Sequence, residues 1–300
     1  MHRRDFFTKT AAVLLALRLG SGHTATLPLQ SDTLTLWPSA ALGADGPTGA
    51  EHLSAKGALT NIAVPSLRVF KPQRPNGRAV LVAGGGGYKR IEMASEAWPA
   101  AQWLVSLGYT AYVLSYRLPA EGWQQGAMAP LQDAQRALRI IRSREQHVQV
   151  LGFSAGGHLL GMAATRPDFQ SYPAVDHLDH APAYADRAAL IYPVITLEAP
   201  YSHTSTHKVL VGAHASQAEN ARWSVERYVT AHTPPMFLVQ AEDDPIADPH
   251  NTLIMAAACE AAHVPVQRYL YASGGHGFGM GRPGTPTTQW PERYRQWLMT

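Results

Sequence analysis

One serine stands among small residues directly after an apolar, β-branched run, in the segment VQVLGFSAGGH at residues 148–158. Ser154 is the centre of a Gly-x-Ser-x-Gly pattern between a predicted strand and a predicted helix. We expect glycine at 152 and 156 because a β-carbon at either position would collide with the neighbouring strand or helix. Such a turn lifts the serine hydroxyl above the carboxyl edge of a sheet, where it can act as a nucleophile.

A serine hydroxyl needs a base, and the base needs a third group that orients it. Among fourteen histidines, His276 stands apart because it lies in GGHGFG, directly after the predicted strand VQRYLY. The carboxylate cluster EDDPIAD (242–248) follows the predicted strand MFLVQA. Serine, acid and histidine thus occur in the order of one known triad arrangement, each after a strand. The four carboxylates of the cluster leave the identity of the acid open at this point.

Four consecutive glycines follow another apolar strand in AVLVAGGGGY, residues 79–88. Backbone amides in such a loop can approach a ligand without interference from side chains. We expect the amides of Gly86 and Gly87, with that of Ala155 at the start of the next helix, to bind a developing oxyanion. A nucleotide site is disfavoured because the Lys-Ser or Lys-Thr tail of a P-loop and the G-x-G-x-x-G spacing are both missing. Tyr88 and Trp123 are candidates for a substrate pocket.

The elements that must position these residues alternate from residue 78 onward. Predicted strands are AVLVAG, TAYVLSY, VQVLGF, AALIYPVI, MFLVQA and VQRYLY, and predicted helices span 94–107, 130–144, 155–165, 249–262 and 290–298. Apolar strands alternating with helices predict an α/β fold, in which a mostly parallel sheet is covered on both faces. We expect one domain over residues 27–300, with an irregular arm at 36–75 that contains one strand, 67–70.

The first 26 residues have the character of a signal peptide. Arg3 and Arg4 precede a short apolar run, residues 11–19, which is about half of what a bilayer crossing needs. RRDFFTK resembles the twin-arginine signal, so we expect the twin-arginine export machinery as a partner and a periplasmic or secreted protein. This leader carries the whole net charge of +3. The neutral remainder does not favour binding to nucleic acid or to an anionic membrane.

Several motifs together resemble a known family. GGGGY, SYRLP (115–119), GFSAGGH and GGHGFG are similar to motifs of the α/β-hydrolase esterases, and most of all to acetylxylan esterases and bifunctional feruloyl/acetylxylan esterases, near the hormone-sensitive-lipase-like group. The resemblance runs from about residue 36 to the carboxyl end. It implies an α/β-hydrolase fold and a serine carboxylic-ester hydrolase that needs no cofactor and deacetylates carbohydrate esters of the xylan type. A serine peptidase of the same fold and a catalytically silent binding protein are the alternatives.

The resemblance also selects one acid of the cluster. In the family the acid is followed by two residues and then valine-proline, and this spacing points to Asp244. Pro245 restricts the loop directly after it. Asp243 is expected to point to the other side of the loop, and Asp248 to cap the following helix. The chain departs from the family at Gly84, where proline is usual, and at residues 247–248, where Ala-Asp replaces Val-Pro.

Other polar groups suggest structural roles. DHLDH (176–180) and the pair His203 and His207 lie on no recognisable helix at ligand spacing, and a serine mechanism needs no metal, so we expect no metal site. Asp133 and Arg136 are three residues apart on a predicted helix, and we expect them to form an ion pair with each other.

Overall fold

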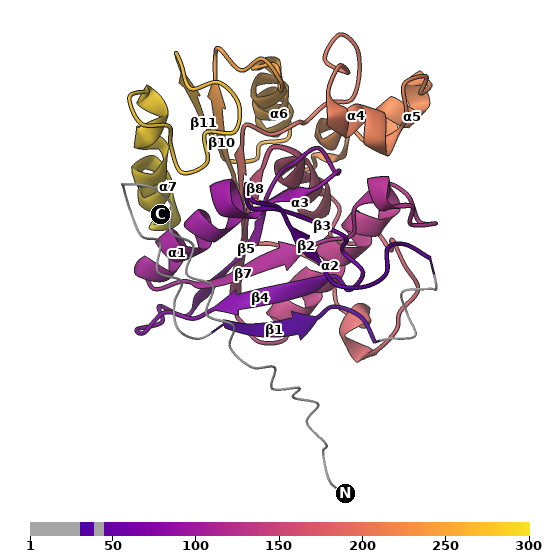
Figure 1. Cartoon of the computed structure of the whole chain (residues 1–300). Helices are drawn as coiled ribbons and strands as arrows, with labels where there is room; N and C mark the ends of the chain where they lie inside the picture. Colours follow the sequence, from indigo (N-terminus) through magenta and orange to yellow (C-terminus); the bar gives the residue numbers. More distant parts are fainter. Residues whose placement is uncertain (1–30, 39–44) are drawn as a thin grey trace, which may run out of the picture.

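A computed structural model describes residues 31–38 and 45–300 (Figure 1). At its centre is an eight-stranded sheet with the order β1-β4-β7-β5-β8-β9-β10-β11. The six strands from β7 to β11 in this order run parallel, whereas β4 pairs antiparallel with β7 and with β1. The strands are β1 (Ser31–Thr35), β4 (Ser66–Phe70), β5 (Arg78–Ala83), β7 (Thr110–Ser115), β8 (His147–Phe153), β9 (Arg187–Ile191), β10 (Met236–Ala241) and β11 (Val266–Tyr271). The predicted mostly parallel α/β fold is confirmed.

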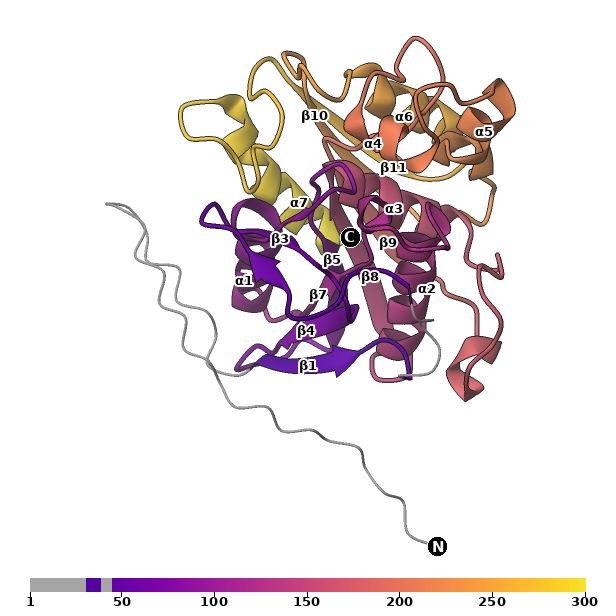
Figure 2. The same cartoon turned by 45° about the vertical axis from the view of Figure 1, so that its right-hand side comes forward.

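Helices lie on both sides of this sheet. Helices α1 and α7 lie on one side, where Trp103 stacks on Tyr294, and α2 and α3 lie on the other (Figures 1 and 2). The helices are α1 (Trp98–Ser106), α2 (Met128–Arg142), α3 (Ser154–Thr165), α4 (Ser205–Leu210), α5 (Gln217–Arg222), α6 (His250–Ala261) and α7 (Trp290–Leu298). Short 3₁₀ turns are η2 (Pro119–Glu121), η3 (His177–His180), η4 (Val225–Tyr228) and η5 (Pro286–Gln289).

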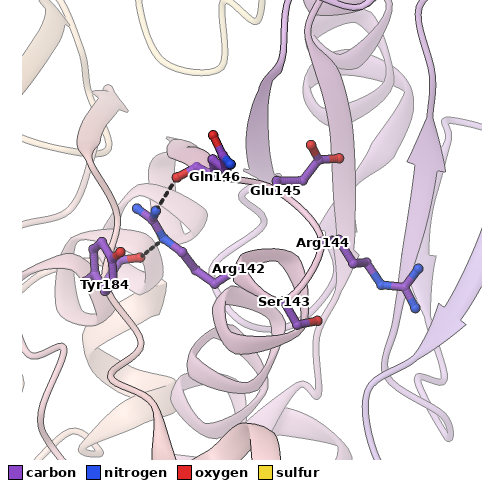
Figure 3. A pocket seen from close by; sticks show the side chains of 6 residues that line it. All are labelled: Arg142, Ser143, Arg144, Glu145, Gln146 and Tyr184. Carbon is purple, nitrogen blue, oxygen red and sulfur yellow. Dashed lines mark hydrogen bonds between the residues drawn. The ribbon is translucent and has the colours of Figure 1, made fainter.

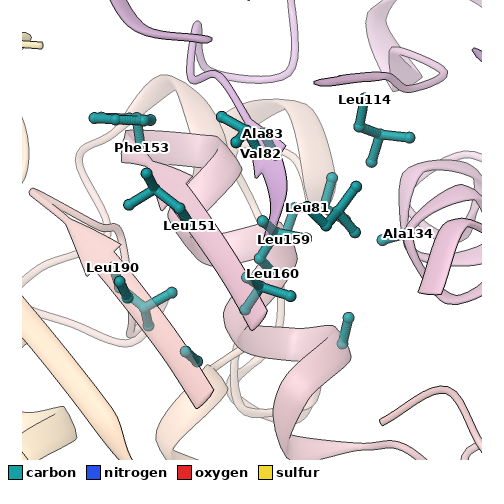
Figure 4. Packing of buried hydrophobic residues seen from close by; sticks show 14 of the residues in the cluster. Leu81, Val82, Ala83, Leu114, Ala134, Leu151, Phe153, Leu159, Leu160 and Leu190 are labelled. Carbon is teal, nitrogen blue, oxygen red and sulfur yellow. The ribbon is translucent and has the colours of Figure 1, made fainter. Parts of the chain in front are cut away.

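The core lies between the sheet and these helices. Every residue of β7 and β10 is buried, as expected for central strands of a sheet covered on both faces. Leucines of β5, β8 and β9 pack with Leu159 and Leu160 of α3 (Figure 4). This close packing holds the carboxyl ends of β5 and β8 beside each other, and the serine and glycine loops leave the sheet at those ends.

The structure differs from the sequence-based expectation in its early part. The arm expected over 36–75 also contains β2 (His52–Leu53) and β3 (Ala58–Thr60), which form a small antiparallel sheet with β6 (Ile91–Glu92). The helix expected from residue 94 begins instead with a π-helical turn, η1 (Met93–Ala97), and α1 follows. Pro99 lies in the first turn of α1, where its missing N–H costs no hydrogen bond.

The predicted signal peptide and the predicted domain boundary at residue 27 lie outside the described residues. Within residues 31–38 and 45–300, no helix combines the length and the apolar character that a bilayer crossing requires.

Candidate active site

Ser154 lies at a strained turn between β8 and α3. Its φ angle is +49°, in the left-handed region that a residue with a β-carbon rarely adopts. A β-carbon at position 152 would lie 2.4 Å from the carbonyl oxygen of Gly156, and one at 156 would lie 2.3 Å from that of Ala83. The expected collisions are confirmed, and they explain why only glycine fits on either side of the serine.

A continuous chain of hydrogen bonds links the serine to a histidine and an acid. Ser154 Oγ lies 2.8 Å from His276 Nε2, and His276 Nδ1 lies 2.8 Å from Asp244 Oδ2. Because a carboxylate only accepts, Nδ1 carries the proton and donates it to Asp244. Nε2 is then the acceptor for the serine hydroxyl. The structure therefore brings together the three residues predicted as a triad, in the tautomer that proton abstraction requires.

Asp244 is fully buried and held from several directions. Its Oδ1 accepts hydrogen bonds from the amides of Ile246 (2.8 Å) and Ala247 (2.9 Å). Its Oδ2 accepts from Gln240 Nε2 at 2.8 Å as well as from His276. These bonds fix the carboxylate so that one oxygen faces the imidazole. Gln240 was not identified from the sequence, since a glutamine at the end of an apolar strand carries no distinctive pattern.

The two other candidate acids have different partners. Asp248 accepts hydrogen bonds from the amide and Nδ1 of His250, the first residue of α6, but the N-cap residue of this helix is Pro249 and not Asp248 as expected. Asp243 accepts from the amide of Gly275 at 2.7 Å, beside His276. Its side chain thus ties the acid loop to the histidine loop, a contact that the sequence analysis did not foresee. Neither carboxylate bonds to the imidazole of His276 in the structure.

The glycine loop after β5 lies against Ser154 at Gly85 and contains two amides that make no hydrogen bond among the described residues. Within the described residues, the amides of Gly86 and Gly87 donate no hydrogen bond, whereas the amide of Gly85 donates to Glu96. Ala155 is the second residue of α3, so its amide has no carbonyl one turn earlier in the helix. The three amides predicted to bind an oxyanion therefore have no acceptor among these residues, and their role in binding an oxyanion stays a prediction.

The structure does not support the predicted pocket roles of Tyr88 and Trp123. Tyr88 is 1% exposed, and its hydroxyl lies 2.8 Å from Nδ1 of the buried His158. Trp123 is 5% exposed and packs against the guanidinium of Arg117. Tyr88 is held inside the protein by a partner 70 residues away in sequence, which a local pattern does not reveal, whereas the partner of Trp123 is six residues away.

The expected ion pair between Asp133 and Arg136 is wrong. Asp133 pairs instead with Arg117 at 2.9 Å, and Arg136 pairs with Asp179 at 2.9 Å and with Asp176 at 2.5 Å. Both arginines are nearly fully buried, so partners from other segments replace the neighbour on the helix. The DHLDH segment therefore binds an arginine. Among the described residues, no group of three potential metal ligands lies together.

A surface hollow lies at the opposite end of β8 from Ser154. It is lined by the turn between α2 and β8, residues 142–146, and by Tyr184 (Figure 3). Arg142 donates there to the carbonyl oxygens of Gln146 (2.6 Å) and Tyr184 (3.3 Å). The strand β8 begins at this hollow and ends at the serine, so the hollow takes no part in the chemistry of the triad.

Comparison with known proteins identifies the family. The BD-FAE family model matches residues 67–258, nearly two thirds of the chain. The chain belongs to the BD-FAE family. It has the α/β-hydrolase fold and the serine, histidine and aspartate arrangement described above, and the family is one of carbohydrate esterases. The match includes Ser154 and Asp244 and ends before His276, which the structure places against both.

Three relatives illustrate the similarity. The chain is 29% identical over 225 residues to an acetylxylan esterase of Xylanibacter ruminicola and 32% identical over 211 residues to an endo-1,4-beta-xylanase B of Butyrivibrio fibrisolvens. These alignments cover 71% and 66% of this chain but only 43% and 32% of the relatives, so the chain spans less than half of their length. A solved structure of an acetyl ester-xyloside bifunctional hydrolase from Caldicellulosiruptor lactoaceticus superposes with a TM-score of 0.74 at 27% identity, covering 92% of this chain and 97% of that one.

Proposed function

We propose that this protein is an exported esterase that removes acetyl groups from carbohydrate esters of the xylan type. The observation that carries the proposal is the hydrogen-bonded chain from Ser154 through His276 to the buried Asp244. The substrate class rests on the similarity to an acetylxylan esterase and to an acetyl ester-xyloside hydrolase.

The geometry supports a two-step mechanism. The hydroxyl of Ser154 attacks the carbonyl carbon of the ester while Nε2 of His276 takes its proton. The resulting imidazolium is stabilised by Asp244, and the oxyanion is bound by the amides of Gly86, Gly87 and Ala155. The imidazolium then protonates the leaving sugar oxygen, which departs as the sugar hydroxyl while the acetyl-serine forms. Water, deprotonated by His276, attacks the acetyl group and releases acetate and the free serine.

Replacement of the nucleophile tests the activity. We expect Ser154→Ala to lower ester hydrolysis by several orders of magnitude, because the remaining acceleration then comes only from the oxyanion site and from binding. The substrates to compare are acetylated xylan, p-nitrophenyl esters of increasing chain length and a peptide amide. Release of acetate from xylan and a preference for short acyl chains support the proposal. Faster cleavage of the peptide amide would indicate a peptidase, and a strong preference for long chains would indicate a lipase.

Export is a separate proposal that rests on the leader. The paired Arg3 and Arg4, the short apolar run and the neutral body support a twin-arginine signal and a periplasmic or secreted mature protein. We expect replacement of both arginines by lysine to leave the precursor in the cytoplasm of the producing bacterium. Fractionation of cells that produce each form measures this, and unimpaired export of the double variant would refute the twin-arginine assignment.

A further inference from the structure

A second buried carboxyl group of the active site binds the glycine loop beside the nucleophile. Glu96, in the π-helical turn η1, is 3% exposed. Its Oε2 accepts a hydrogen bond from the amide of Gly85 at 2.5 Å. The backbone of Gly85 lies against the serine, since a β-carbon there would lie 2.6 Å from Cβ of Ser154 and 3.2 Å from Oε2 of Glu96. Glu96 thus binds the amide of Gly85, a glycine of the loop whose backbone lies against the nucleophilic residue.

The other oxygen of the same carboxyl group reaches the histidine side of the site. Glu96 Oε1 accepts a hydrogen bond from the hydroxyl of Tyr192 at 3.0 Å. The Tyr192 hydroxyl accepts in turn from the amide of Gly279 at 3.0 Å, three residues after His276. The tyrosine ring also lies edge-on to the imidazole, with ring centroids 5.0 Å apart. One carboxyl group therefore connects the glycine loop to the histidine loop.

The bonding of Glu96 is unusual for a buried acid. Burial raises the pKa of Glu96 to about 7, against the opposing effect of the hydrogen bonds from Gly85 and Tyr192. Among the described residues, no lysine or arginine pairs with it. A buried carboxyl group without a cation is costly. Its position in a π-helical turn, a feature that is frequent at functional sites, points to a role in the reaction.

We propose that Glu96 is a positioning residue that sets the direction of the oxyanion-binding amides and keeps them in register with His276. Four consecutive glycines have more conformational freedom than any other run of residues, and an oxyanion site works only when its donors are already oriented. Because the Gly85 amide is bound to Glu96, the peptide planes that follow it are restrained while the amides of Gly86 and Gly87 stay free. This inference rests on the proposed ester hydrolysis at Ser154.

Glu96→Gln tests the role with little change in shape. The glutamine oxygen replaces only one of the two carboxyl oxygens and its nitrogen accepts no hydrogen bond, so either the Gly85 amide or the Tyr192 hydroxyl loses its acceptor. We expect kcat for p-nitrophenyl acetate at pH 8 to fall about 10–100-fold, less than the loss of an oxyanion donor itself, with KM changed less than about threefold. Tyr192→Phe removes only the link to the histidine loop and should lower kcat less. The double variant should lose less than the product of the two single effects.

Glu92→Gln is the matched control. It makes the same chemical change four residues earlier, at a side chain that pairs with the exposed Arg90 at 2.6 Å, and it should leave kcat within about twofold of wild type.

Ser154→Ala is measured in parallel. If Ser154→Ala is inactive while Glu96→Gln and Tyr192→Phe keep wild-type kcat, the positioning role is refuted and the proposed function stands. A rise in KM alone, or a loss of thermal stability at unchanged kcat, would also refute it. If Glu96→Gln does not fold, the kcat of Tyr192→Phe tests the proposal: a reduced kcat supports the positioning role and a wild-type kcat refutes it. An active Ser154→Ala would refute the proposed function itself.

Discussion

Two groups of acids that are buried, apart from the half-buried Asp176, have different kinds of partner in this protein. The first, which we call the α2 cluster, consists of Arg117 with Asp133 and of Arg136 with Asp176 and Asp179. Each arginine there has at least one carboxylate at 2.9 Å or less. Arg117 also donates to the carbonyl oxygen of Ala129 and to Gln132. The negative charges of these carboxylates are therefore neutralised by the arginines, and Arg117 also binds neutral oxygens.

The second group consists of Asp244 and Glu96 at the active site, and its partners are neutral. Asp244 accepts hydrogen bonds from two amides, a glutamine and the imidazole of His276, and Glu96 from an amide and a tyrosine hydroxyl. Among the described residues, no lysine or arginine pairs with either. The negative charge of Asp244 is therefore unpaired until His276 gains a proton during the reaction.

Because the two groups have different partners, we expect the α2 cluster to contribute to stability and the active-site acids to contribute to catalysis. A carboxylate already neutralised by an arginine has little further attraction for an imidazolium, whereas one bound by neutral donors stabilises the charge that appears on His276. We expect changes in the α2 cluster to lower the free energy of unfolding and changes at Asp244 to lower kcat. The predictions below test that separation, beginning with the largest effect.

Asp244→Asn should lower kcat about 10³–10⁴-fold. The amides of Ile246 and Ala247 require an oxygen at the Oδ1 position, so the new amide nitrogen faces His276. That nitrogen donates to Nδ1 and forces the imidazole into the tautomer that cannot take the serine proton. Steady-state kinetics with p-nitrophenyl acetate measures the effect. Asp248→Asn is the control, with kcat expected within about twofold of wild type, and loss of turnover in that variant instead would mean that Asp248 is the acid.

Asp133→Asn should lower the free energy of unfolding by about 3–5 kcal/mol, because Arg117 then remains buried without a counter-charge. The kcat of the folded fraction should stay near wild type, since Asp133 pairs with Arg117 and contacts none of the triad residues. Urea unfolding at pH 7 and active-site titration measure the two quantities. A large fall in kcat per titrated site would contradict the separation between the two clusters.

His158 sharpens the comparison because it is buried with neutral partners yet lies outside the triad. Burial lowers the pKa of His158 to about 4, opposed by the hydrogen bond to the Trp223 carbonyl oxygen, and an unfolded histidine titrates near 6.5. The native state thus binds fewer protons than the unfolded state between these values. The contribution of His158 is complete above pH 6.5, declines as the pH falls toward 4, and amounts to about 3 kcal/mol.

The measurement is the difference in unfolding free energy between wild type and His158→Gln, from urea unfolding at pH 7, 5.5 and 4. As the pH falls from 7 to 4, we expect wild type to lose about 3 kcal/mol of unfolding free energy relative to His158→Gln. Using the difference removes the effect of other titrating groups, including Glu96, whose raised pKa acts in the opposite direction. A difference independent of pH would show that His158 is protonated in the native state or exposed to water.

The sequence by itself determined the features that depend on local chemistry and on strand order. Gly152, Ser154 and Gly156 predicted the strained turn, because the conformation of such a turn excludes β-carbons around the serine. The alternation of strands and helices predicted a parallel sheet, and the carboxyl ends of its strands necessarily bring the loops with Ser154 and His276 to one edge. Asp244 needed the family spacing as well, since four carboxylates share its loop.

Tertiary structure alone decided the partners of buried polar groups. Arg117 rather than Arg136 pairs with Asp133, Tyr88 turns inward to His158, and Glu96 reaches both Gly85 and Tyr192. Tyr88 and His158 are 70 residues apart, and Glu96 and Tyr192 are 96 apart. No periodicity or motif in the sequence predicts which of these residues pair. A buried donor or acceptor must find a partner once water is excluded, and packing of the whole chain determines which partner is within reach.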